Sequence, residues 1–149
     1  MKIELIIIAI MFLLFFTLFT ICYMILTVEP YMNVKIREIK VKTFNATYTS
    51  FTNITFILVI VEVRYWAVSK SIVGVYVEVR RLDTGAVVYS GIKSAVVSGS
   101  GCSEFAFEVS RDIGCCTGVK LECIAVGFLR FRELYDEKVD LAVTTVTKN

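Results

Sequence analysis

The chain opens with a long stretch that lacks charge: from Leu5 to Val28, 24 consecutive positions carry no charged side chain. A helix of that length covers ~36 Å at ~1.5 Å per residue, enough to cross a hydrocarbon core ~30 Å thick with some tilt. Only scattered threonines interrupt it, and a threonine hydroxyl can bond back to a carbonyl one turn earlier. We therefore expect a transmembrane anchor over residues 1–30, whose helix ends at Glu29-Pro30 because the residue before proline avoids the α-helical region.

Two other interpretations of this segment stay open. A cleaved secretory signal peptide has an apolar core of about 7–15 residues followed by a small-x-small cleavage site. The run here is longer, and Ile25–Val28 contains no Ala-x-Ala pattern. The segment Lys2–Ile10, in which Glu4 is the lone acid before an apolar helix, resembles the start of a mature type IV pilin. That resemblance implies a subunit of a filament or envelope complex that assembles through its apolar helix.

The side of the membrane on which residues 31–149 lie is indicated by opposing signals. Four basic residues follow the helix between positions 35 and 42, and the positive-inside rule alone would place them in the cytoplasm. Against this, Asn45-Ala46-Thr47 and Asn53-Ile54-Thr55 are both N-glycosylation sequons without proline. An even set of four cysteines, Cys102, Cys115, Cys116 and Cys123, also fits an oxidising compartment. We expect an extracytoplasmic domain, with Asn45 and Asn53 as candidate glycosylation sites.

The four cysteines allow three pairings, and buried free thiols are the alternative. If Ser103–Val109 is a straight strand, it carries the chain about 20 Å from Cys102 at ~3.3 Å per residue, whereas a disulfide needs Cα atoms within about 7 Å. Cys123 lies in the next expected strand, which runs back alongside. Our hypothesis is one bridge within Cys102–Cys123, joining Cys115 or Cys116 to Cys123.

After Pro30 the residue pattern becomes that of β-strands. In Ile72–Arg81, valines at 73, 75, 77 and 79 alternate with larger or polar residues, which indicates a half-buried strand. Asp83-Thr84-Gly85 predicts a tight turn, after which Ala86–Tyr89 returns as a hairpin. Ile54–Val61 is apolar on both faces and rich in β-branched residues, so we expect a central strand covered on both sides.

The remaining sequence supplies further short strands. We expect Val34–Thr43, with a bulge near Arg37-Glu38, then a strand around Phe105–Val109, and finally Val119–Arg132 and Lys138–Thr147 around a charged turn, Glu133–Lys138, that carries the acidic pair Asp136-Glu137. About seven strands with regular turns predict an all-β fold of two antiparallel sheets packed face to face. The side chains expected between the sheets are Val75, Val77, Phe105, Phe107, Leu121 and Val143.

The order and lengths of these strands resemble the immunoglobulin-like and fibronectin-type-III-like modules of membrane-anchored surface proteins, over about residues 33–147. In that resemblance Ile54–Tyr65 corresponds to strand B, Ile72–Arg81 to C, Ser103–Val109 to E and Val119–Arg130 to F. It implies a seven-stranded antiparallel immunoglobulin-like sandwich preceded by one transmembrane helix. A late-embryogenesis-abundant-type sandwich is similar in layout, but the Asn-Pro-Asn signature of that family is missing.

The composition argues against catalysis. The chain contains no His and a formal net charge of only +2, so the commonest general base and metal ligand are missing and nothing favours nucleic acid as a partner. The cysteine spacing is poor for zinc, because Cys115 and Cys116 are adjacent. We expect no enzyme, no cofactor and no metal. The chain contains no Gln, and because amide side chains are thermolabile, this favours a thermophilic source.

These observations predict a single-pass membrane protein that displays a β-sandwich with a structural, adhesive or protein-interaction role. Its expected partners are membrane lipid and either an unknown protein or other copies of the chain. The alternative is the pilin-like or envelope-complex subunit described above.

Overall fold

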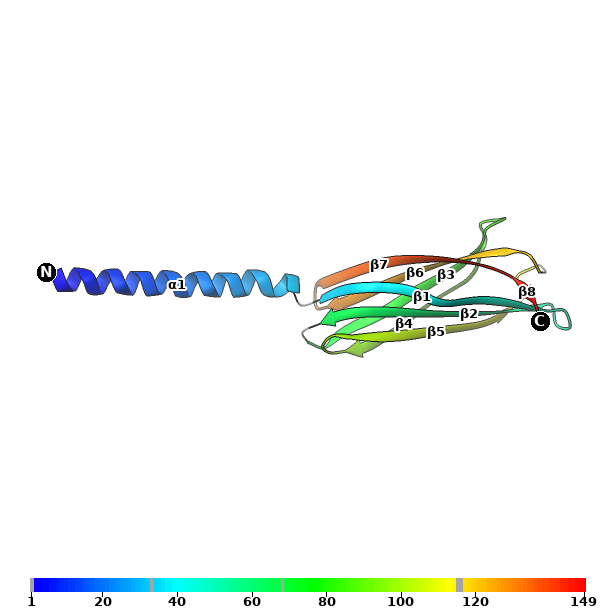
Figure 1. Cartoon of the computed structure of the whole chain (residues 1–149), viewed down its shortest axis with the longest axis horizontal. Coiled ribbons are helices and arrows are strands. Elements are labelled where there is room, and N and C mark those ends of the chain that lie inside the picture. Colours follow the sequence, from blue (N-terminus) through cyan, green and yellow to red (C-terminus); the bar gives the residue numbers. More distant parts are fainter. Residues whose placement is uncertain (1, 33, 68, 115–116) are drawn as a thin grey trace. The chain divides into compact units, whose positions relative to one another are not determined.

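The computed structural model describes the backbone of residues 2–32, 34–67, 69–114 and 117–149 and, within the helix, the side chains of residues 6–24. The chain divides into two units, Met1–Asn33 and Val34–Asn149. The first contains helix α1 (Lys2–Met32) and the second contains all the strands (Figure 1). The strands are β1 (Val34–Thr49), β2 (Ile54–Ala67), β3 (Ser71–Arg81), β4 (Val87–Val97), β5 (Gly101–Arg111), β6 (Lys120–Phe131), β7 (Leu134–Thr145) and β8 (Thr147–Lys148).

Helix α1 has the properties of a membrane span. The segment Ile6–Met24 has a mean hydropathy of 2.7 and is long and apolar enough to cross a bilayer. Two of its threonine hydroxyls bond within the helix, since Thr17 donates a hydrogen bond to the Leu14 carbonyl (2.9 Å) and Thr20 to that of Phe16 (2.7 Å). The expected end at Glu29-Pro30 is wrong, because α1 continues to Met32. A proline so near the end removes only the hydrogen bond of its own missing N–H.

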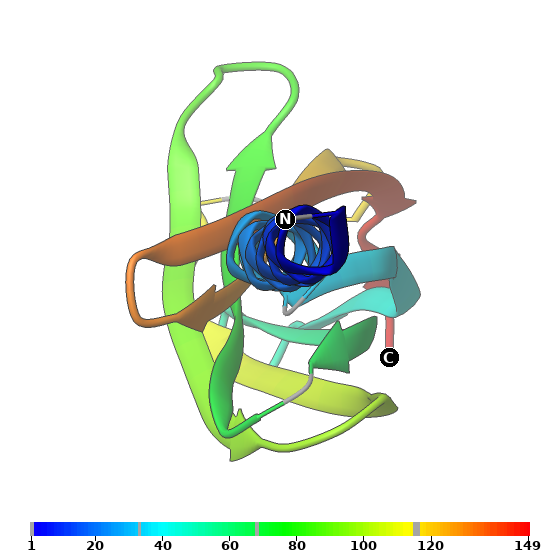
Figure 2. The ribbon, with the colours of Figure 1, turned by 90° about the vertical axis from the view of Figure 1, so that its left-hand side faces the viewer.

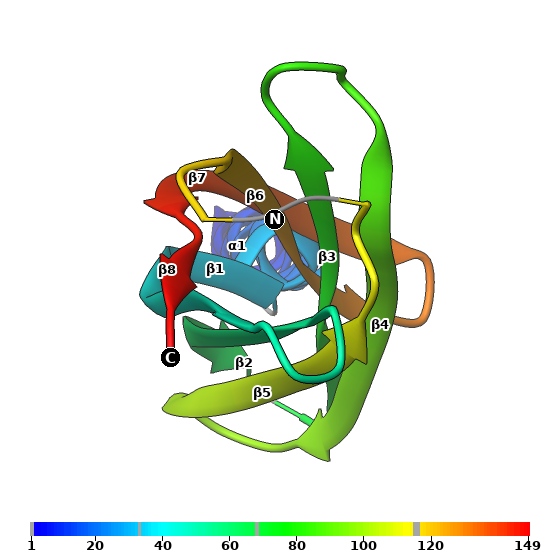
Figure 3. The same ribbon diagram turned by 90° about the vertical axis from the view of Figure 1, so that its right-hand side faces the viewer.

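The second unit is a sandwich of two four-stranded sheets, with orders β5-β2-β1-β8 and β4-β3-β6-β7. Viewed along the strands, the sheets form separate layers (Figures 2 and 3). The described residues form eight strands, where the sequence predicts about seven. The eighth arises because Val146 is buried between the sheets, after which the chain leaves β7 and pairs in parallel with β1. The expected bulge is confirmed by a register shift between Ile36 and Glu38, and a second shift occurs between Val41 and Thr43.

The hydrophobic core lies between the sheets. Val73, Val75, Val77 and Val79 of β3 are completely buried there and face residues of β2 and β5. Of the six predicted core residues, five are buried and Val143 is not. The expectation that Ile54–Val61 is covered on both faces is also wrong. This strand is central in its sheet, but Phe56 is 42% exposed, because no further layer covers that side.

Val143 faces outward because of the way in which β7 bonds to β1. Its inward positions include two aspartates that lie against the edge of β1, where the Asp136 carboxylate accepts a hydrogen bond from the Ile36 N–H (2.7 Å) and the Asp140 carboxylate from the Val41 N–H (2.8 Å). Residues five apart in a regular strand present their N–H groups to opposite edges. The bulge between Ile36 and Glu38 brings both groups to the same edge. The apolar residues of β7 consequently occupy its other face.

The β6–β7 connection is also tighter than expected. The prediction of a charged turn over Glu133–Lys138 is wrong, because β7 already starts at Leu134 and includes Asp136 and Glu137. Two residues, Arg132 and Glu133, separate the strands, and Arg132 adopts a positive φ of 52°. By contrast the predicted β3–β4 turn is confirmed, with Gly85 at φ 70°.

Replacing Asp140 by alanine is expected to lower the free energy of unfolding by about 1.5 kcal/mol, near the lower end of the range for hydrogen bonds to charged groups, because the Val41 N–H loses its acceptor in a half-buried place. Denaturant unfolding of the chain in mild detergent measures this change. Glu137→Ala, on the outward face of the same strand, is the matched control and should cost less than about 0.5 kcal/mol. Equal losses for both variants would contradict the capping role.

Candidate interaction surface

The outer face of the sheet β4-β3-β6-β7 carries an unusual density of apolar side chains. We call this surface the apolar face. Six of its side chains are each 57–70% exposed, namely Ile92, Val96, Tyr135, Val139, Leu141 and Val143. Ile72 is 44% exposed, and Tyr76, Ile124, Val126 and Phe128 are half-buried between them. An exposed patch of this extent on a sheet marks an interaction site more often than an ordinary surface.

The strand register arranges the apolar face in rows that run across the sheet. One row consists of Ile92, Tyr76, Val126 and Val139, with one residue from each strand. The neighbouring row brings Glu78, Ile124 and Leu141 together in the same way. Because alternate residues of paired strands share a face, all these side chains point to the same side of the sheet. The apolar side chains are thus neighbours on one surface and not a set of isolated residues.

Close packing on the apolar face depends on Gly74 of β3. The Phe128 ring of β6 lies directly over this glycine, so that a Cβ atom added at Gly74 would be 2.3 Å from the ring. Tyr135 of β7 stacks on Phe128, with ring centroids 6.5 Å apart and ring planes at 16°. The missing side chain at Gly74 therefore lets two aromatic rings lie flat on this part of the sheet.

Charged side chains also lie on the apolar face. Arg130 is the register partner of Ile72, and Glu137 is that of Phe128. Glu78 accepts hydrogen bonds from the Tyr76 hydroxyl (2.8 Å) and from Arg80, and these two partners lower the pKa of its carboxyl group. The same carboxylate raises the pKa of the Tyr76 hydroxyl. At the edge of the face, Arg80 of β3 lies beside Glu122 of β6. Within the described part of the chain, Glu122 forms no ion pair.

The outer face of the other sheet has a different character. Lys42 binds Glu62 and lies 3.4 Å from Glu104, and Arg64 binds Glu62 (2.9 Å) and lies 3.7 Å from Glu38. The hydrogen bond from Lys42, followed by that from Arg64, lowers the pKa of the Glu62 carboxyl group. These side chains satisfy one another, so this network is a solvated charged surface that stabilises itself and leaves no group poised for chemistry.

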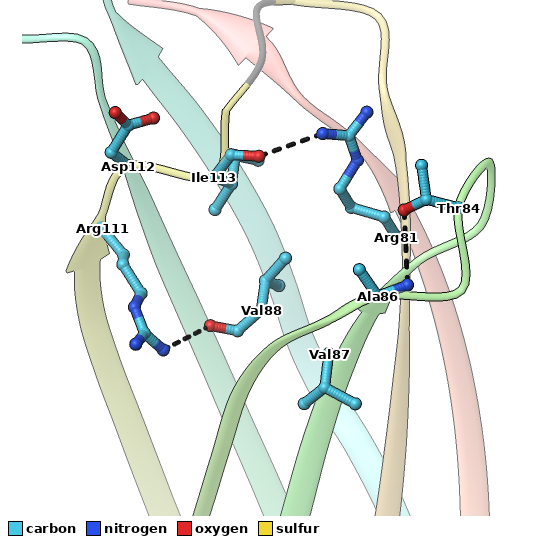
Figure 4. Close-up of a pocket in the computed structure, with 8 residues that line it drawn as sticks. All are labelled: Arg81, Thr84, Ala86, Val87, Val88, Arg111, Asp112 and Ile113. Carbon is cyan, nitrogen blue, oxygen red and sulfur yellow. Dashed lines mark hydrogen bonds between the residues drawn. The ribbon is translucent and has the colours of Figure 1, made fainter.

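A hollow of about 480 Å³ opens where β3, β4 and β5 meet the adjoining loops (Figure 4). Both cations on its wall have structural tasks. Arg81 donates to the Ile113 carbonyl (3.0 Å) and pairs with Asp83 (2.5 Å), whose pKa it lowers, and Arg111 donates to the Val88 carbonyl (2.9 Å). The arginines thus connect the loop after β5 to β3 and β4, and the hollow offers no group positioned for catalysis.

Two of the four cysteines of the disulfide hypothesis lie among the described residues. Cys123 is a free thiol buried in the core on β6, where desolvation raises its pKa to about 12. Cys102 is a free, exposed thiol on β5. Cys115 and Cys116 lie outside the described residues. The proposed bridge from one of them to Cys123 is not formed in this structure, in which Cys123 is a free thiol.

Both sequon asparagines are exposed. Asn45 lies on the outer face of β1, and Asn53 lies in the β1–β2 turn at φ 54°, where its side chain accepts a hydrogen bond from Tyr48 (2.8 Å). Because β1 is 16 residues long, it carries the turn to the end of the sandwich opposite Val34. The Thr55 hydroxyl of the second sequon is buried without a hydrogen-bond partner among the described residues.

The described residues contain no group of three or more His, Cys, Asp or Glu side chains that could hold a metal ion. The acidic pair Asp136-Glu137 is divided between the two faces of β7, with Asp136 capping β1 and Glu137 accepting a hydrogen bond from Tyr135 (2.9 Å). The feature that sequence reasoning missed is the apolar face. Its signal was the run from Cys123 to Leu129 in β6, which carries no charged residue on either face although only one faces the core.

Comparisons with known proteins show likeness in fold only. No family model matches the chain, and no curated protein matches it. Among solved structures, a protein from Archaeoglobus fulgidus aligns with a TM-score of 0.45 and 12% identity, over 74% of this chain and 95% of that one. The C-terminal domain of wzt aligns with a TM-score of 0.42 and 16% identity, over 78% of this chain and 75% of that one.

A β-glucuronidase from Bacteroides uniformis aligns at a TM-score of 0.46 and 15% identity, over 70% of this chain but only 12% of the enzyme. None of these three names an immunoglobulin or fibronectin family.

Proposed function

We propose that this protein is a membrane-anchored interaction module, in which helix α1 holds the chain in the bilayer and the sandwich presents the apolar face to a protein partner outside the cytoplasm. The single observation that carries the proposal is the apolar face, since six of its large apolar side chains are more than half exposed. The helix contributes the anchor, because its segment Ile6–Met24 has the length and hydropathy of a membrane span.

The finer fold assignment belongs to the same proposal. The sandwich is of the immunoglobulin-like or fibronectin-type-III-like kind. This is supported by the pairing of β2 with β5 and of β3 with β6, the strands that correspond to B, E, C and F in the resemblance. Modules of this class work by display, and a display role agrees with a site that is a broad apolar surface. An extracytoplasmic location is supported by the exposed Asn45 and Asn53.

Placing two carboxylates on the apolar face is expected to abolish the interaction. In Val139→Glu/Leu141→Glu, both charges would have to be buried unpaired when a partner binds, which is costly. Formaldehyde cross-linking of the full chain in cell membranes, followed by blotting, should show at least about a tenfold loss of cross-linked species of any composition.

The matched control is Phe56→Glu, which replaces an exposed apolar residue on the outer face of the other sheet. It should leave the cross-linked species intact, and all variants should unfold at similar temperatures because every substituted side chain is exposed. Unchanged cross-linking of the Val139→Glu/Leu141→Glu variant would refute the interaction role of the apolar face.

A further inference from the structure

We propose that the partner on the apolar face is a second copy of this chain, bound in the same membrane with the two sandwiches side by side and their strands aligned. This inference rests on the proposed function, because it names the occupant of the same face. Two sheets that pack face to face keep their strands within about 30° of each other at a separation of about 10 Å, so a sheet face of this kind is a suitable surface for another sheet.

The size of the apolar face fits a dimer. Four strands spaced ~4.8 Å apart and about eleven residues long at ~3.3 Å per residue give a surface of roughly 700 Å². A stable interface buries about 800 Å² per partner, so one copy of the face supplies nearly one side of a standard interface. A two-fold axis brings this surface against itself, so that the uncharged row of Ile92, Tyr76, Val126 and Val139 lies on the same row of the second copy.

Opposite charges meet if the axis runs along the strands. Each row then meets the same row of the second copy in reversed order, so that β3 lies over β6 and β4 over β7. Tyr76 then faces Val126 of the other copy, and Glu78 faces Ile124 in the next row. Two rows from Tyr76, at the rim, Arg80 faces Glu122 of the other copy, and this contact occurs twice by symmetry. The long Arg80 side chain spans the lateral offset that the angle between packed sheets introduces.

The opposite alignment, with the axis across the strands, gives other contacts. Arg80 would then face the end of the sheet that contains Ile72, and Glu122 would face Arg130 of the other copy, because Arg130 lies as far from Val126 along β6 as Glu122 does. That alignment also places the two Val34 positions at opposite ends of the paired faces, as would suit copies in two different membranes. Anchors in one membrane hold the Val34 ends together and raise the effective concentration of aligned copies.

A charge-exchange experiment on the full chain tests the pairing. Arg80→Glu places Glu against Glu122 of the other copy, and Glu122→Arg places Arg against Arg80. Each variant alone should therefore associate at least about tenfold more weakly than the unaltered chain. Association is measured by co-purification of two differently tagged, co-expressed copies in mild detergent. When the two variants are mixed, every intermolecular contact is again between opposite charges, and association should return to within a few-fold of the original.

The mixture distinguishes contacts between copies from contacts within one copy. Within each variant chain, positions 80 and 122 carry the same charge, so recovery in the mixture can come only from contacts between the two copies. The control Arg64→Glu makes the same charge change on the outer face of the other sheet and should leave association unchanged. Failure of the mixture to recover, or full association of either variant alone, overturns the aligned dimer. If that occurs while Val139→Glu/Leu141→Glu still removes all cross-linked species, the face binds another protein and only the second-copy assignment fails.

Discussion

Replacing Phe107 by alanine is expected to lower the free energy of unfolding by about 3–5 kcal/mol, the usual cost of deleting a buried aromatic ring. The Phe107 side chain is only 1% exposed, and its ring packs edge-on against Tyr89 with centroids 6.4 Å apart. The Lys93 ammonium lies 5.4 Å above the ring as a cation–π contact, which the substitution also removes. Denaturant unfolding of the chain in mild detergent measures the loss.

Phe56→Ala is the matched control, because Phe56 lies on the same sheet but is 42% exposed on the outer face. It should cost less than about 1 kcal/mol. A loss below that value for Phe107→Ala would show that the inward face of β5 is misassigned.

Two aspartates in the middle of α1 are expected to release the chain from the membrane. Each charge at the centre of a span costs about 2.5–3.5 kcal/mol on insertion scales, and Phe15→Asp/Leu18→Asp places both within the segment Ile6–Met24. Alkaline carbonate washing of membranes should leave the unaltered chain in the pellet and the variant in the supernatant. Thr17→Val is the control and should stay in the pellet, because it removes only a hydroxyl that is already bonded within the helix.

The same membranes test the side on which the sandwich lies. Protease added to intact cells should digest residues 34–149 if the domain is extracytoplasmic. Protection in sealed cells with digestion only after lysis would contradict the proposed location, whereas loss of the unaltered chain to the carbonate supernatant would contradict the anchor.

The local patterns predicted much of the fold because they reflect local physics. The period of two in Ile72–Arg81 follows from one buried face, and the β3–β4 turn follows from the positive φ that Gly85 tolerates. The orientation of β7 does not follow from its own pattern. Its apolar residues alternate as a core strand would require. The face that turns inward is instead the one with Asp136 and Asp140, because their carboxylates accept hydrogen bonds from backbone N–H groups about 100 residues earlier.

The apolar face could not be predicted for a related reason. An apolar residue in a strand indicates that its side chain is favoured away from water. It does not indicate whether the other sheet or another molecule buries that side chain. Val126 and Val139 become recognisable as surface residues only when the register places them together on the outside. A cysteine pattern likewise carries no information about which face of β6 holds Cys123.

The dependence of β1 on strands far along the chain has a consequence for biosynthesis. The free edge of β1 is closed by residues 99–101 positions later. At about 5–20 residues per second, a nascent chain needs roughly 5–20 s to supply them. For that time β1 can pair with β2 but offers a bare edge, the situation that invites mispairing with other chains. Lys35, Arg37, Lys40 and Lys42 all lie exposed along this strand, and charged side chains deter such edge-to-edge pairing. As a topology signal, the basic segment after the helix points toward the cytoplasm. Its position on β1 also suits it to deter edge-to-edge pairing before β7 and β8 have been synthesised.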